Sequence, residues 1–243
     1  MKTATLIILS IFLSLKSFGD ETLFIQANTE YANENYSTAI SLYDSILSMN
    51  LESSELFYNL GNCYYKTKDW ANTIWHYEKS LQLNPRNNNA THNLELARLR
   101  IIDQIEPIPK LFYKRWWEET TQLFTTKIWQ ILAIMYIWLI LIFQLTKKFF
   151  KLKNKYFRIF LNAIGIIIIC ITYTNIQQNK NEAIIFSSSV IVNSAPSEKS
   201  TNLFSLHSGT KVELTEQIGD WLNIRILNGN TGWIKTSHCK IIK

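Results

Sequence analysis

The chain has few of the residues on which catalytic and nucleotide-binding folds rely. Among its 243 residues are 7 glycines, 4 prolines and 3 cysteines. The glycines form no phosphate-binding loop, and the sequence contains neither a G-x-S-x-G nor an H-E-x-x-H pattern. Cys63, Cys170 and Cys239 form no C-x-x-C pair, and the four histidines lack metal-ligand spacing. We therefore expect a protein that is not an enzyme, with no catalytic residue, no metal site and no cofactor.

The chain has a net charge of +6, but its basic and acidic residues are unevenly distributed along the sequence. Residues 20–109 carry 6 basic and 12 acidic side chains, whereas residues 110–158 carry 10 basic and 2 acidic ones. The excess of basic residues lies beside long apolar runs, where attraction to anionic phospholipid headgroups would account for it. Because residues 20–109 are acidic, a nucleic-acid partner is not expected.

The first 19 residues have the form of a signal peptide. Lys2 is followed by an apolar run from residue 4 to 15, and then by Ser17 and Gly19 before a cut near Asp20. The run is short for a membrane span. An uncleaved anchor is the alternative, and both interpretations export the segment that follows.

Two longer runs, residues 128–146 and 159–179, contain no Asp, Glu, Lys, Arg or His. Each is close to the ~20 residues that cross a bilayer, so they are predicted to be transmembrane helices 1 and 2. The alternative is a buried helical hairpin in a soluble domain. The absence of charge within the runs argues against a pump or a proton relay.

The residues around these runs predict their orientation. The loop at residues 147–158 carries only basic charges, which the positive-inside rule places in the cytoplasm. The segments before and after the two spans then lie on the opposite side. Residues 107–127 combine Trp116 and Trp117 with basic side chains and predict an interfacial linker, with a simple linker as the alternative.

A spaced set of residues between the signal peptide and the first span repeats with a period of about 34. A shift by one period pairs Tyr43 with Tyr77. The set resembles a tetratricopeptide repeat (TPR), so residues 20–106 are predicted to be all-α TPR repeats with a capping helix, ended by Pro107 and Pro109. An ordinary helical hairpin domain is the alternative. The residues that match the pattern are Phe57, Leu60, Gly61, Tyr64, Tyr77 and Pro85.

The inner face of the first helix in each repeat is the best candidate site. Asparagines there offer donor and acceptor together, which suits the backbone of an extended protein segment. The alternative is that these are solvated polar residues without a ligand. The predicted partner-binding residues are Asn28, Tyr58, Asn59, Asn62, Tyr65, His92 and Asn93.

Residues 183–243 change to short alternating apolar runs with turn signals between them, typical of about five strands. Asn228-Gly229 is a strong hairpin signal. The order of V-I-V-N-S-A-P, L-H-S-G-T-K-V, G-D-W and N-G-N-T-G-W-I resembles a bacterial SH3 (SH3b) domain, an all-β barrel. The resemblance implies binding of cell-wall peptides or proteins, with Trp221 and Trp233 as a candidate ligand surface.

The whole order of segments, with D-x-I-E-P-x-P at residues 103–109 and the Trp-Trp pair, resembles the BatE family. The fold class is then a multidomain membrane protein: TPR repeats, a two-helix transmembrane hairpin and an SH3b-like barrel. The resemblance implies an aerotolerance or envelope-stress role in the bacterial inner membrane, with TPR and SH3b on the periplasmic side. It also implies von Willebrand-type Bat membrane proteins and a MoxR-type ATPase as partners.

These observations favour a non-enzymatic membrane-anchored scaffold that binds protein partners. A peptidoglycan-binding envelope anchor or sensor, acting through the SH3b segment, is the alternative. An enzyme would be a third class, but no motif supports one. An exported position also leaves open a disulfide through Cys239.

Overall fold

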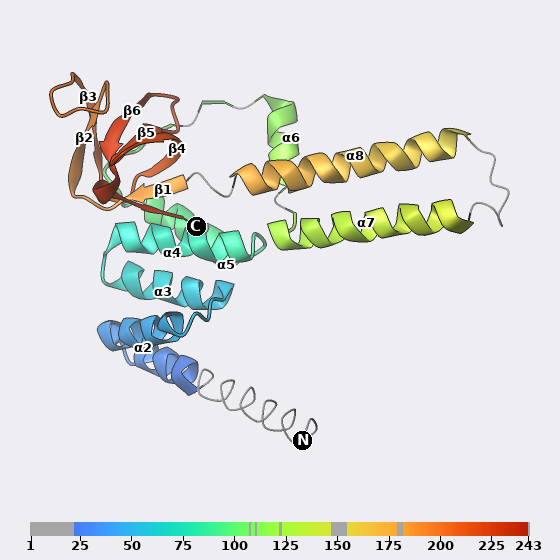
Figure 1. Cartoon of the computed structure of the whole chain (residues 1–243). Coiled ribbons are helices and arrows are strands. Elements are labelled where there is room, and N and C mark those ends of the chain that lie inside the picture. The colour runs from blue at the N-terminus through green and yellow to red at the C-terminus, as the bar shows by residue number, and fades with distance from the viewer. Residues whose placement is uncertain are drawn as a thin grey trace, which may run out of the picture.

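The computed structural model describes residues 22–106, 108–109, 111–121, 123–146, 155–178 and 182–242. The predicted signal peptide and residues 147–154 of the basic loop lie outside them. Figure 1 shows a stack of short helices beside a β domain, and two long helices that project together from one side. We call residues 22–98 the helical stack and residues 182–242 the β domain.

The helical stack is built from antiparallel helices joined by tight turns. Residues 22–32 are helical, followed by α2 (Tyr36–Ser48), α3 (Ser54–Lys66), α4 (Trp70–Leu83) and α5 (Asn88–Arg98). Side chains of Ser53, Asp69 and Asn87 accept hydrogen bonds from the first turns of α3, α4 and α5, which fixes where these helices begin. The N-terminal region is therefore helical, as predicted.

Two local features explain the packing and the end of the stack. A Cβ atom added to Gly61 would overlap Cε1 of Tyr77, so the glycine of the repeat pattern lets α3 approach α4 closely. The expectation that Pro107 and Pro109 end the third repeat's helix is wrong. Helix α5 ends at Arg98, with Leu99 as its C-cap, and the chain then runs without helix toward the β domain.

The β domain is one antiparallel sheet of seven strands in the order β3-β2-β6-β5-β4-β1-β7, two more strands than the sequence pattern indicated. The predicted hairpin at Asn228-Gly229 joins β5 to β6, and Gly229 has φ 88°. Alternate residues such as Val190, Val192 and Ile234 form the core. The strands are β1 (Glu182–Ile185), β2 (Ser189–Asn193), β3 (Asn202–His207), β4 (Lys211–Ile218), β5 (Trp221–Arg225), β6 (Thr231–Lys235) and β7 (Cys239–Ile241).

The helical stack and the β domain share one hydrophobic core. Ile184 of β1 and Ile242 after β7 are 0% and 3% exposed, and they belong to the same buried cluster as helix residues. The indole N–H of Trp75 also donates to the carbonyl of Ile241 at 3.2 Å. The helical members of the cluster are Ala71, Ile74, Tyr77, Leu94 and Ala97. The two predicted domains are therefore one packed unit, joined by contacts between residues far apart in the sequence.

Charged side chains reinforce this junction. The Glu78 carboxylate lies 2.7 Å from Arg98 Nη2 and 3.0 Å from Lys211 Nζ. Lys211 Nζ also lies 2.7 Å from the carboxylate of Glu182. Burial works to raise the pKa of Glu78, but the neighbouring Lys211 and Arg98 cations outweigh it and hold that pKa below its ordinary value. Glu78 is thus a buried anion held between the two parts of the unit.

The segment after α5 straps the β domain to the stack. The Asp103 carboxylate accepts hydrogen bonds from the backbone N–H of His207 at 2.6 Å and from the Thr210 hydroxyl at 2.6 Å. Its other oxygen lies 2.7 Å from His207 Nδ1. Ile105 packs against the core of the β domain. The D-x-I-E-P stretch therefore begins with residues that fix the position of the β domain.

A helical insertion connects the strap to β1. It contains α6 (Phe112–Thr121), α7 (Thr126–Thr146) and α8 (Lys155–Gln178). Figure 1 shows α7 and α8 side by side, with α6 steeply inclined to α8 at the end of α8 nearest the unit. The Tyr136 hydroxyl donates to the carbonyl of Leu161, and a Cβ on Gly165 would lie 2.6 Å from the ring of Tyr136. We call α7 and α8 the helix pair.

One helix of the pair is long and apolar enough to cross a membrane. The stretch Thr126–Phe143 has a mean hydropathy of 1.9, and 6% of it is buried. The apolar part of α8, Ile159–Thr174, is shorter. By length and composition, α7 is therefore a candidate membrane span, whereas the crossing of α8 remains a prediction.

Candidate functional site

A row of asparagines crosses the helical stack and is held in place by tyrosines. The side-chain oxygen of Asn28 accepts a hydrogen bond from the Tyr43 hydroxyl at 2.5 Å and another from Asn59 Nδ2 at 3.0 Å. Asn28 lies on the first helix, Tyr43 on α2 and Asn59 on α3. One amide thus joins three successive helices.

The same arrangement recurs one repeat later. Asn62 Oδ1 accepts from the Tyr77 hydroxyl at 2.7 Å and from Asn93 Nδ2 at 3.0 Å. Each member of this second trio follows its counterpart in the first by one 34-residue repeat. We call Asn28, Asn59, Asn62 and Asn93 the amide ladder. The sequence predicted all four as site residues, and the structure brings them together.

The two tyrosines that support the ladder were not predicted as site residues. Tyr43 and Tyr77 are each 1% exposed, and burial raises the pKa of both hydroxyls above the ordinary value. They therefore stay protonated and donate to the asparagine oxygens. The 34-residue spacing between Tyr43 and Tyr77 was visible in the sequence, but only their helical packing was inferred from it.

The remaining predicted residues of the inner face have different surroundings. Tyr58 is half-buried, with its hydroxyl 3.4 Å from Asn93 Nδ2. Tyr65 packs edge-on against Trp70, with 5.5 Å between ring centroids. His92 is exposed on α5. Tyr58 thus adjoins the ladder, while Tyr65 contributes to packing.

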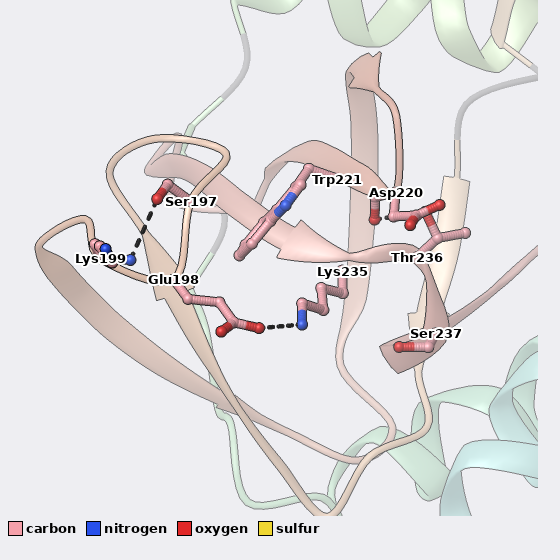
Figure 2. A pocket seen from close by; sticks show the side chains of 8 residues that line it. All are labelled: Ser197, Glu198, Lys199, Asp220, Trp221, Lys235, Thr236 and Ser237. Atoms are coloured by element: carbon pink, nitrogen blue, oxygen red, sulfur yellow. Dashed lines mark hydrogen bonds and ion pairs between the residues drawn. The ribbon is translucent and has the colours of Figure 1, made fainter.

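The β domain carries a pocket of about 760 Å³ beside Trp221. Figure 2 shows the indole of Trp221 near Lys235, which forms an ion pair with Glu198. The Lys235 ammonium lies 5.8 Å from the Trp221 ring centroid, and its hydrogen bond lowers the pKa of Glu198. Such a mixture of aromatic surface and both charges suits a polar ligand. The lining residues are Ser197, Glu198, Lys199, Asp220, Trp221, Lys235, Thr236 and Ser237.

The second predicted tryptophan of the β domain does not line this pocket. Trp233 is 8% exposed, and it sits across from Asn193 of β2 and Asn223 of β5. Trp221 is therefore the better candidate for ligand contact. In the described part of the chain, no three His, Cys, Asp or Glu side chains form a group that could hold a metal ion.

Comparisons with known proteins identify both binding modules. Residues 54–87 match the Tetratricopeptide repeat family, and residues 188–239 match the family described as Bacterial SH3 domain. The chain is also similar to Sperm-associated antigen 1 of Rattus norvegicus, with 33% identity over 84 residues. This alignment covers 32% of the chain but only 9% of the relative. The predictions of a TPR repeat and an SH3b domain are confirmed, and modules of these kinds bind proteins or peptidoglycan rather than catalyse reactions.

Proposed function

We propose that this protein is a non-enzymatic, membrane-anchored scaffold that holds protein partners on the inner face of its TPR stack. The observation that carries the proposal is the amide ladder, a repeated row of hydrogen-bonding side chains supported from behind by buried tyrosines. Fixed amides bind a partner at a lower entropic cost than mobile ones. The inner-face site comprises the amide ladder with Tyr58, Tyr65 and His92.

The shared core bears on how the anchor crosses the membrane. Because Ile184 and Ile242 pack against α4 and α5, the helical stack and the β domain must lie on the same side of any bilayer. The chain between them must then cross an even number of times. If α7 crosses, α8 has to return, despite its shorter apolar stretch. An even number of crossings supports two spans, with the basic loop on the side opposite the folded unit.

The basic residues of that loop support a cytoplasmic position for it. Both modules would then lie in the periplasm of a bacterium. The helix pair would attach them to the inner membrane and contact its lipid bilayer. The order of segments, which resembles the BatE family, supports a place in a Bat-type complex that responds to envelope stress. Von Willebrand-type Bat membrane proteins and a MoxR-type ATPase are the proposed partners.

The test replaces the two members of the ladder that donate to the other two, Asn59 and Asn93. In Asn59→Glu/Asn93→Glu, the two amide donors to Asn28 and Asn62 are lost and two negative charges are added. After cross-linking in intact cells, the tagged full-length variant should recover at least tenfold less partner, with unchanged membrane insertion. The control, Asn33→Glu/Asn50→Glu, adds the same charge at exposed turn positions. Equal recovery of partner by the two variants would contradict the proposal that the inner face is the partner-binding site.

A second candidate function, an envelope anchor or sensor that binds peptidoglycan, is favoured by the Trp221 pocket. Its aromatic surface and paired charges resemble those of sites that hold polar ligands. Full-length protein in detergent would be sedimented with purified peptidoglycan. If the second function holds, Trp221→Ala should abolish retention while Asn59→Glu/Asn93→Glu leaves it unchanged. Absence of retention for the unmodified protein would remove this candidate.

A further inference from the structure

We propose that α6 lies along the surface of the lipid bilayer as an in-plane anchor, with its apolar face in the leaflet nearest the folded unit. This inference rests on the membrane anchor of the proposed function, because it takes α7 as a span. It goes further by assigning a lipid contact outside the helix pair, and by giving that contact control over how the helical stack stands above the bilayer.

One side of α6 is apolar and exposed. Phe112 and Trp116 lie one turn apart, with side chains that are 78% and 64% exposed, and Tyr113 beside them is 51% exposed. Lys114 is two residues from both Phe112 and Trp116, which places it about 160° from each around the helix. A helix with an aromatic apolar side and a basic side opposite is typical of one that lies in a membrane interface.

The position of α6 along the chain places it at the edge of the hydrocarbon core. The apolar stretch Thr126–Phe143 has 18 residues, which span about 27 Å as a helix, close to the ~30 Å of a bilayer core. Helix α6 ends at Thr121, just before this stretch, and Figure 1 shows it steeply inclined to α8 at the end of α8 nearest the unit. If the helix pair crosses the membrane, α6 therefore runs along its surface, at the depth where Trp and Tyr are enriched.

Side-chain contacts tie α6 both to the span and to the helical stack. The indole N–H of Trp129, near the start of α7, donates to the carbonyl of Thr121 at 2.9 Å, and Trp129 is 7% exposed. The ring of Phe124 packs edge-on against Trp129, with 5.5 Å between centroids. Arg86, in the turn between α4 and α5, places its guanidinium 4.8 Å from the centroid of Phe124. The depth of α6 in the leaflet thus bears directly on the orientation of the stack.

Lipid fits this surface better than a protein partner or a second copy of the chain. Residues 110–127 carry 4 basic and 2 acidic side chains, and a basic excess beside an apolar face suits anionic headgroups. Arg115 and Glu119, which border the apolar face, lie 3.9 Å apart, so the acid is paired. Once α7 has inserted, lipid is already beside α6, and a protein on the same face would have to displace it. We therefore favour lipid as the occupant.

The experiment uses the full-length protein, with its native cysteines replaced, in nanodiscs of phosphatidylethanolamine and phosphatidylglycerol. A nitroxide is attached to Trp116→Cys on the apolar side or, as the matched control, to Lys114→Cys on the opposite side of α6. Power saturation measures collisions of the label with oxygen, which concentrates in lipid, and with a water-soluble nickel complex. The ratio of oxygen to nickel collisions should be roughly threefold or more higher for Trp116→Cys, because the apolar face of an interfacial helix lies about 5–10 Å deep.

Two further labels keep the test independent of the loss of Trp116 and of the span. Phe112→Cys reports from the apolar side with Trp116 intact, and it should give the same lipid-like ratio. Met135→Cys, at a side chain that is 62% exposed in the middle of the apolar stretch of α7, reports whether the span itself is in lipid.

Two outcomes on α6 would overturn the inference. Equal ratios at Phe112→Cys, Trp116→Cys and Lys114→Cys would place the whole helix in water. Few collisions with either reagent at Phe112→Cys and Trp116→Cys would mean that protein, a second copy or a partner, covers the apolar side. With a lipid-like ratio at Met135→Cys, either outcome removes the contact of α6 and leaves the membrane anchor intact. A water-like ratio at Met135→Cys would refute the anchor and, with it, this inference.

Discussion

The junction between the helical stack and the β domain differs in kind from the contact between α7 and α8. At the junction, Glu78, Lys211 and Asp103 make short, directional contacts to named partners. Along the helix pair, most large side chains are exposed, and the two helices meet at Tyr136, Gly165 and Thr172. The junction therefore depends on a few polar residues, whereas the helix pair depends on its apolar surface as a whole.

The two regions should therefore tolerate different kinds of mutation. A buried ion pair that loses one partner leaves an uncompensated charge, which costs several kcal/mol. An apolar side chain on an exposed helix surface can be exchanged for another apolar side chain with little effect. We expect the junction to be the sensitive region of the protein and the helix pair to be the tolerant one.

The largest effect is expected at Glu78. Glu78→Ala leaves Lys211 with only the half-exposed carboxylate of Glu182 and leaves Arg98 without its ion pair, so the free energy of unfolding of the unit should fall by about 3 kcal/mol. Chemical denaturation of the full-length protein in detergent measures it. The control is Glu213→Ala, which removes an exposed ion pair with Arg225 and should cost under ~1 kcal/mol. A similar loss of unfolding free energy in the two variants would show that the junction is no more sensitive than an exposed surface ion pair.

A second effect should come from His76, which lies in the stack against Tyr64. Burial lowers the pKa of His76 from its ordinary 6.5 to about 4. Between pH 6.5 and about pH 4, His76 is protonated in the unfolded chain but neutral in the folded chain. The free energy of unfolding therefore falls as the pH falls through this range. The slope should be up to about 1.4 kcal/mol per pH unit. Thermal unfolding from pH 7 to pH 4.5 measures it, and His76→Gln should flatten the curve; an unaltered slope in that variant would contradict the assignment.

The smallest effect on the folded unit is expected from the helix pair. Gly165→Ala places a Cβ 2.6 Å from Tyr136, so α7 and α8 should separate slightly. The yield of a disulfide engineered between the two helices should drop, while the denaturation midpoint of the unit stays within error. Ile166→Ala, at a side chain that is 62% exposed, should change neither quantity. A large loss of unit stability from Gly165→Ala would show that the two regions are not independent.

The sequence predicted the elements better than it predicted their assembly. Period and turn chemistry indicated the TPR helices and the Asn228-Gly229 hairpin, because such signals are local. The junction was not predicted, because Ile184 and Ile242 lie more than 85 residues from their helical partners in the sequence. Apolar alternation predicts a strand with a buried face, but it does not identify the element that packs against that face. Likewise, the inner-face asparagines were predicted from their helical positions. The orientation of their side-chain amides depends on hydrogen bonds from Tyr43 and Tyr77 of the neighbouring helices.

Side-specific labelling would test most directly the claim that one unit, on one side of the membrane, is anchored by a helix pair. Single cysteines would replace Asn50 of the helical stack and Asn228 of the β domain, both exposed, in a background without the three native cysteines (Cys63→Ala/Cys170→Ser/Cys239→Ser). A membrane-impermeant maleimide would be added to spheroplasts. With the whole unit on one side of the membrane, both sites should be labelled without lysis, whereas a cysteine at residue 151 of the basic loop should be labelled only after lysis. Labelling of Asn50→Cys and Asn228→Cys from opposite sides would contradict it.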